Sequence, residues 1–157
     1  DIRGVADRDL DDSTVRAIGQ ALGKRVEGKQ VVVGRDPRVQ SPRLFAALTD
    51  GLRVHADVID IGVVPTPVTY FAAYELGCNS CVSVTGSHNP PDYNGLKMVI
   101  GGTTLALDAI QQLKARAGGG NLTHGQGQRR SAGRLVIHRQ LWRCRSSGVR
   151  GMPWCSR

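Results

Sequence analysis

Residues 81–97 read CVSVTGSHNPPDYNGLK, a stretch that joins two apolar runs through a polar loop. The run from Cys81 to Val84 is short, apolar and rich in valine, and it predicts a buried strand. The run from Leu96 to Ile100 predicts the next strand. Open α/β sheets place their ligands at the carboxyl ends of strands, so this loop indicates both the fold class and the position of a site.

Upstream of this stretch, helical and strand patterns alternate. Apolar residues at a spacing near 3.6, together with cap residues and prolines, predict three helices. These are expected from a cap at Ser13 through Val26, from Ser41-Pro42 through Leu52, and from Thr66-Pro67 through Leu76. Two further strands are expected at 31–33 and 58–61, and a last helix from about Asp108 to Arg116. The sequence therefore predicts an α/β fold, with a mixed, mostly parallel sheet and helices on both faces.

Charge divides the chain into two parts. Of the 21 basic residues, eight follow residue 117, whereas none of the 13 acidic residues does. Residues 1–117 are therefore electrically balanced, and we expect them to form a single domain. Residues 118–157 begin with three glycines and show no lasting helical or strand period, so we expect an irregular Gly/Arg-rich tail.

The tail has two interpretations. A basic arm could bind nucleic acid or another acidic surface, which would make the chain a nucleic-acid-binding protein. Alternatively, the last part of the chain could derive from a shifted reading frame, since it is free of acidic residues and enriched in arginine, cysteine and tryptophan. We favour the second interpretation and consider nucleic-acid binding the weaker alternative.

Cys78 and Cys81 form a single CxxC pair, which could be half of a zinc site or a redox pair. No second CxxC accompanies it, so we favour two small apolar residues beside a buried strand. No apolar run approaches the ~20 residues of a membrane-spanning helix. We expect no membrane association and a cytoplasmic location.

The loop after Val84 contains residues able to do chemistry. Gly86 permits a tight turn and leaves room beside Ser87, and the paired prolines that follow stiffen the loop. A serine hydroxyl is a weak nucleophile unless a base, a metal or a cation assists it, and His88 and Lys97 are candidates. A hydrogen-bonded turn without catalysis would use the same residues, so the local chemistry leaves both interpretations open.

Four segments together resemble one family. The stretch TGSHNPPDYNGLK at 85–97 closely resembles the active-site serine loop of the alpha-D-phosphohexomutase superfamily, in its phosphomannomutase/phosphoglucomutase branch. DIRG at 1–4, GRDPR at 34–38 and VPTP at 64–67 are similar to further family motifs in the same order. The resemblance covers residues 1 to about 117, which correspond to the first of the family's four domains.

The resemblance implies a role for each matching residue. Ser87 would be a phosphoserine that exchanges its phosphoryl group with a hexose phosphate, and its phosphate would be one ligand of Mg²⁺. Lys97 would act as general acid/base, and Arg3 would bind the phosphoryl group. His88 and Asn89 would shape the loop. Phosphoryl transfer depends mainly on positioning and on compensating charge, which such groups provide.

The same resemblance implies partners outside this sequence. The family's second domain supplies a carboxylate loop of the DGDxDR type for Mg²⁺, and its third and fourth domains contact the sugar and its phosphate. None of these motifs occurs here. We therefore expect the isolated chain to lack family-typical mutase activity.

Overall fold

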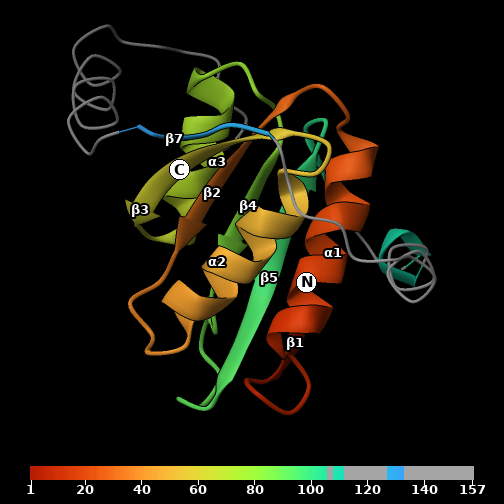
Figure 1. The fold of residues 1–157 in the computed structure, drawn as a ribbon. Coiled ribbons are helices and arrows are strands. Elements are labelled where there is room, and N and C mark those ends of the chain that lie inside the picture. Colours follow the sequence, from red (N-terminus) through yellow and green to blue (C-terminus); the bar gives the residue numbers. More distant parts are fainter. Residues whose placement is uncertain (106–107, 112–126, 133–157) are drawn as a thin grey trace, which may run out of the picture.

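The structure, a computed structural model, describes residues 1–105, 108–111 and 127–132. Its elements follow one another along the chain as shown in Figure 1. They are β1 (Ile2–Val5), α1 (Asp12–Arg25), β2 (Gln30–Arg35), α2 (Ser41–Leu52), β3 (Asp57–Val63), α3 (Thr66–Glu75), β4 (Cys81–Val84), β5 (Tyr93–Ile100), β6 (Thr103–Thr104) and β7 (Arg129–Ser131). The described strands form one sheet in the order β1-β5-β4-β2-β3-β7, with β6 on β5.

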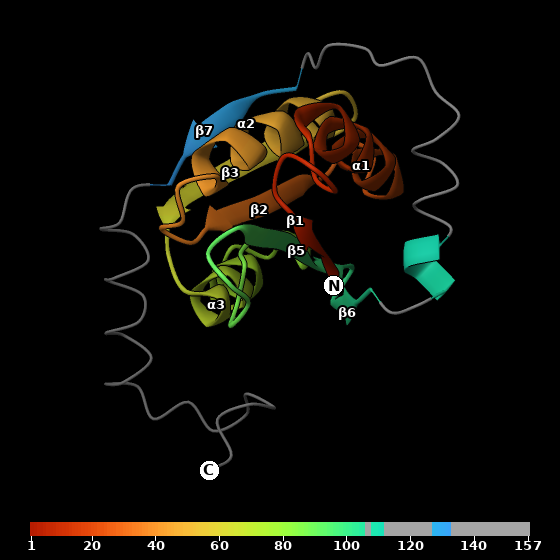
Figure 2. The same ribbon diagram turned by 90° about the horizontal axis from the view of Figure 1, so that it is seen from below.

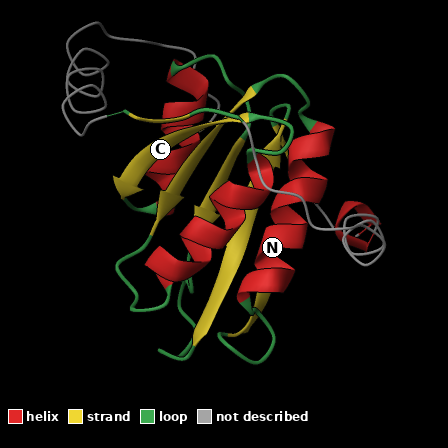
Figure 3. Ribbon diagram, in the orientation of Figure 1, coloured by secondary structure: helices red, strands yellow, loops and turns green. Residues whose placement is uncertain are grey.

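The sheet is mixed. β4, β2, β3 and β7 run parallel to one another, whereas β5 is antiparallel to β4, β1 and β6. Among the described strands, β5 alone runs in the opposite direction, since its neighbours β1, β4 and β6 are all antiparallel to it. The expected α/β class, with a mixed, mostly parallel sheet and helices on both faces, is confirmed (Figure 3).

Helices cover the two faces of the sheet unequally. Figure 2 shows α1 and α2 on one face and α3 on the other. Side chains alternate along β2 accordingly, because Val31 and Val33 belong to the core beneath α1 and α2, and Val32 belongs to the core beneath α3. We call the second side the α3 face.

Glycines allow α1 and α2 to pack at close range. A Cβ added to Gly51 would overlap the carbonyl oxygen of Arg16, and one added to Gly19 would overlap that of Leu48. Neither position has room for a methyl group. The backbones of the two helices are therefore in direct contact over the buried face of the sheet.

Several boundaries differ from those expected. The cap of α1 is Asp11, whose side chain accepts a hydrogen bond from the backbone N–H of Thr14 at 2.7 Å, whereas Ser13 lies inside the helix. β5 begins at Tyr93, three residues before the expected strand, because its first residues pair with β1. Residues 108–111 are helical, and the rest of the helix expected to Arg116 lies outside the described residues.

The expected domain boundary between 117 and 118 also lies outside the described residues. Beyond it, β7 pairs with β3 within the segment expected to be irregular. A strand of three residues is too short to produce a recognisable period in the sequence. In the part of the chain that the structure describes, no helix combines the length and the apolar character that crossing a membrane requires.

Candidate active site

Ser87 stands in the loop that follows the carboxyl end of β4. Its backbone has φ +53°, in the left-handed region that residues with a side chain rarely adopt. Its N–H donates to the Thr85 hydroxyl at 2.9 Å. The side chain is half-buried, and no described residue makes a hydrogen bond with its hydroxyl. The serine is therefore held by its backbone while its hydroxyl remains available.

Asp36, just after β2, supports the turn before the serine. Its carboxylate accepts the N–H of Gly86 at 2.9 Å and that of Arg38 at 3.1 Å, and it also accepts the Ser41 hydroxyl. Burial raises the pKa of Asp36, but the hydrogen bonds from Ser41, Gly86 and Arg38 outweigh it and hold this pKa below its ordinary value. Asp36 therefore remains a carboxylate beneath the loop.

Arg38 contacts the same loop from below. Its guanidinium donates to four loop carbonyl oxygens, those of Ser87 (3.2 Å), Asn89 (2.7 Å), Tyr93 (3.1 Å) and Pro90. The same guanidinium forms an ion pair with Asp36 at 3.4 Å. The Arg38 side chain is only 19% exposed, so it is largely buried beneath the loop to which it donates.

The two residues after Ser87 differ in their surroundings. Asn89 closes the turn, because its backbone N–H and its side-chain amide both donate to the Gly86 carbonyl, at 3.1 and 3.0 Å. His88 is exposed. These two hydrogen bonds support the expectation that Asn89 shapes the loop, which stays a prediction. For the exposed His88, no comparable hydrogen bond is found among the described residues.

Strand β1 brings Arg3 to Lys97. The Asp1 carboxylate lies 3.0 Å from the Lys97 ammonium and 3.0 Å from the Arg3 guanidinium. Leu96 and Met98 belong to the core beneath α1 and α2, so Lys97 between them lies on the α3 face. Two cations share one carboxylate here, which leaves this corner of the α3 face with net positive charge.

Strand pairing connects this corner to the serine loop. Gly95 of β5 pairs with Arg3 on one side, and on the other its carbonyl accepts the Thr85 N–H at 2.9 Å. A Cβ on Gly95 would overlap the backbone carbonyl oxygen of Ile2 in β1 and would lie 3.3 Å from Cγ of Arg3. The absence of a side chain at Gly95 therefore lets Arg3 lie close to the root of the loop that carries Ser87.

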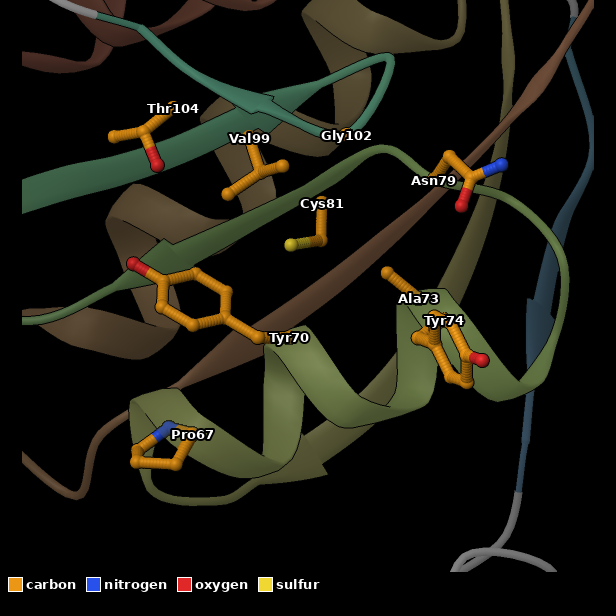
Figure 4. A pocket seen from close by; sticks show the side chains of 9 residues that line it. All are labelled: Pro67, Tyr70, Ala73, Tyr74, Asn79, Cys81, Val99, Gly102 and Thr104. Atoms are coloured by element: carbon orange, nitrogen blue, oxygen red, sulfur yellow. The ribbon is translucent and has the colours of Figure 1, made fainter. Parts of the chain in front are cut away.

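A separate pocket lies farther along the α3 face. Figure 4 shows Pro67, Tyr70 and Tyr74 of α3 opposite Cys81 of β4 and Val99 of β5. None of the expected catalytic residues lines it. The pocket is mainly apolar and is not the site of the expected chemistry.

The two cysteines of the CxxC pair differ in burial. Cys81 is fully buried, and burial raises its pKa to about 12. Within the described ranges, no cluster of three or more His, Cys, Asp or Glu side chains could hold a metal ion. The burial of Cys81 agrees with a small apolar residue of a buried strand, whereas Cys78 is half-buried.

Comparison with protein families matches residues 1–121 to the family described as phosphoglucomutase/phosphomannomutase, alpha/beta/alpha domain I. The chain belongs to this family. The phosphomannomutase/phosphoglucomutase of Pseudomonas putida is 47% identical over 132 residues, which are 82% of this chain and 28% of that protein. The phosphoglucomutase of Neisseria gonorrhoeae is 44% identical over 119 residues, 73% of this chain and 26% of that protein.

Solved structures agree with this assignment. A phosphoglucomutase/phosphomannomutase family protein of Burkholderia thailandensis superposes with a TM-score of 0.76 at 47% identity, over 83% of this chain and 31% of its own. A putative phosphomannomutase of Thermus thermophilus gives 0.76 at 25% identity, over 94% and 34%. The chain spans between about a quarter and a third of the length of these relatives, and the part that it matches is domain I.

Sequence reasoning missed three residues of this phosphoglucomutase/phosphomannomutase domain. Asp36 and Arg38 were recognised only as part of a family-like turn, and Asp1 only as part of DIRG. Their contacts reach residues about 50 to 96 positions away in the chain. Only the repeated pattern of charged residues in GRDPR, next to a glycine, could have drawn attention to the first two.

Proposed function

We propose that this domain supplies the phosphoryl-carrying serine of a longer phosphohexomutase that acts on mannose or glucose phosphates in the cytoplasm. The Oγ–P bond of phosphorylated Ser87 breaks as a sugar hydroxyl oxygen bonds to the phosphorus; the Lys97 ammonium gives a proton to the departing Oγ and receives the proton of the sugar hydroxyl in exchange. When the bisphosphorylated sugar returns its other phosphoryl group, Lys97 gives a proton to the departing sugar oxygen and receives that of the Ser87 hydroxyl. Each step therefore conserves phosphate and protons.

The observation that carries this proposal is the conformation of Ser87 in the loop that leaves β4, a strand that pairs with the β5 strand carrying Lys97. The serine is fixed in a left-handed backbone conformation at the end of β4. Arg3 and Lys97 share Asp1 on the neighbouring strands of the same sheet. A phosphoserine carries a charge of about −1.5 to −2, and cations of this kind compensate it. Arg3 would accordingly bind the phosphoryl oxygens, and Asn89 and His88 would shape the loop around them.

This domain would supply only part of a Mg²⁺ site. Mg²⁺ prefers about six oxygen ligands in octahedral geometry, and phosphorylated Ser87 would provide one. The described residues supply no carboxylate cluster to complete that set. They do not fit a magnesium site by themselves, and the remaining ligands would have to come from domains II–IV.

Nucleic-acid binding gains no specific support. Of the arginines in the basic tail, Arg129 pairs with Asp60 at 2.8 Å and Arg130 donates to Gln30 at 3.1 Å. The other arginines of the tail lie outside the described residues.

A coupled assay that follows conversion of glucose 1-phosphate to glucose 6-phosphate tests the proposal. We expect turnover by the full-length mutase and none by residues 1–157 alone. Ser87→Ala should abolish most of the activity with the fold intact, whereas Ser13→Ala on the exposed side of α1 should keep it. Full activity of Ser87→Ala would show that another serine carries the phosphoryl group, and robust activity of residues 1–157 would refute the need for further domains.

A further inference from the structure

The Arg38 guanidinium donates four hydrogen bonds to carbonyl oxygens around the serine loop. A guanidinium has five N–H groups and no acceptor. Nε faces Asp36 at 3.4 Å, and the two terminal nitrogens donate to four carbonyl oxygens of the loop. Four hydrogen bonds and one ion pair thus engage all three guanidinium nitrogens, and the loop acceptors stand about 50 residues away in the chain.

The turn before the serine is shaped to receive this side chain. A Cβ built on Gly86 would overlap the Arg38 guanidinium, so the flat group lies directly against the glycine backbone. Asp36 accepts the N–H of the same glycine and also pairs with Arg38. Asp36 and Arg38 of the GRDPR turn therefore both contact Gly86, Asp36 through its carboxylate and Arg38 through its guanidinium.

Ser87 needs such support because of its backbone conformation. A left-handed conformation costs an L-residue roughly 1–2 kcal/mol. The contacts of its two peptide groups offset this cost, since the Thr85 hydroxyl accepts its N–H and Arg38 donates to its carbonyl oxygen. Without them the loop would relax toward ordinary φ values and move the hydroxyl.

We propose that Arg38 is a positioning residue that holds Ser87 in the geometry for phosphoryl transfer through the carbonyl oxygens of the loop, without contacting the phosphoryl group. This inference rests on the function proposed for Ser87. Arg38 also keeps four carbonyl oxygens turned toward itself, so that their negative dipole ends do not face the phosphate. A displacement of about 1 Å at a reacting group can lower a rate by a factor of about 100.

The substitution Arg38→Lys distinguishes the effect of the positive charge from the effect of the planar arrangement of hydrogen-bond donors. Lysine keeps the positive charge but offers three donors on one nitrogen and lacks the planar arrangement of arginine. The matched control is Arg43→Lys, because Arg43 stands on α2 and forms ion pairs with Asp7 and Asp12, away from the serine loop.

Three measurements on the full-length mutase test the inference: steady-state kinetics, hydrogen exchange and chemical rescue. We expect Arg38→Lys to lower kcat by about 100-fold with KM for the hexose phosphate unchanged. Backbone hydrogen exchange measured without substrate should become faster at residues 86–93 and stay unchanged in β2 and β3. Arg38→Ala should regain part of its rate with added methylguanidinium but not with methylammonium, which a merely structural defect would not do. Arg43→Lys should match the wild type in all of these.

Distinct results would overturn each part. Unchanged hydrogen exchange at residues 86–93 in Arg38→Lys would show that Arg38 does not stabilise the loop. Faster exchange with an unchanged kcat would show that the stabilised loop conformation is not needed for catalysis. If Arg38→Ala fails to fold, Arg38→Lys and the exchange of β2 and β3 still decide. Wild-type protein that never carries phosphate on Ser87 would refute the function proposed for the serine and the catalytic role of Arg38 with it.

Discussion

The Lys97 ammonium lies 3.0 Å from the Asp1 carboxylate, which the Arg3 guanidinium also contacts at 3.0 Å. Two neighbouring cations repel each other, and the shared carboxylate reduces that repulsion. Their combined charge still exceeds that of Asp1. This corner of the sheet is therefore suited to an anion such as a phosphoryl group.

Lys97→Met tests the proton-transfer role. Methionine keeps much of the length of the side chain and removes its proton, so kcat of the full-length mutase should fall by about 10²–10⁴-fold. The fold should persist, because Lys97 contacts Asp1 at a partly exposed position. Steady-state kinetics and far-UV circular dichroism measure the two effects. Lys24→Met on the exposed side of α1 is the control, and equal kcat values for the two variants would exclude Lys97 as acid/base.

Gly86→Ala should reproduce the loss expected for Arg38→Lys. The added methyl group would occupy the place of the Arg38 guanidinium and expel it from the loop. Because both substitutions break the same contact, the double variant should lose little more than either single variant. A double-mutant cycle on kcat/KM measures this coupling. Losses that multiply in the double variant would mean that the two residues act independently.

Asp36→Asn should change how stability depends on pH. The folded-state pKa of Asp36 is below its ordinary value of 3.8, so its carboxylate stabilises the fold above about pH 4, and this contribution is lost as the pH falls through the folded pKa. The variant should be less stable at neutral pH and should lose less stability on acidification. Urea unfolding at a series of pH values tests this, with Asp92→Asn at an exposed position as control. Parallel pH curves for wild type and Asp36→Asn would contradict it.

Gly51→Ala should destabilise the contact between α1 and α2. The added Cβ would overlap the Arg16 carbonyl oxygen, which is backbone and cannot move without shifting the helix. Overpacking of this kind costs about 1–3 kcal/mol of unfolding free energy. Ala46→Gly on the exposed side of α2 is the control, with an expected cost of roughly 0.5–1 kcal/mol. An unchanged unfolding midpoint in urea for Gly51→Ala would contradict the close approach of the two backbones.

The central part of the fold could be predicted from the sequence because its signals are local. Val31–Val33 forms a continuous apolar run, and Leu44, Leu48 and Leu52 repeat with the period of a helix. β1 gave no such signal, since its four residues include an arginine and a glycine and its partner β5 lies some 90 residues later. Edge strands of this kind are recognised only when the chain has folded.

The candidate site likewise has a part that the sequence could predict and a part that it could not. Ser87, Asn89 and Lys97 lie within eleven consecutive residues, and the sequence indicated them together. The support beneath them could not be predicted, because the Arg38 contact with Ser87 spans 49 positions and the Lys97 contact with Asp1 spans 96. Local patterns identify groups able to do chemistry, whereas the contacts that position them depend on the tertiary fold.

The position of the phosphoryl group is the most direct test of the role of Ser87. The full-length mutase would be incubated with glucose 1,6-bisphosphate, quenched in acid and analysed by peptide mass spectrometry. We expect one phosphorylated residue, Ser87, and no phosphorylation in Ser87→Ala. Phosphate on another residue of the wild type, or an equally phosphorylated Ser87→Ala protein, would contradict it.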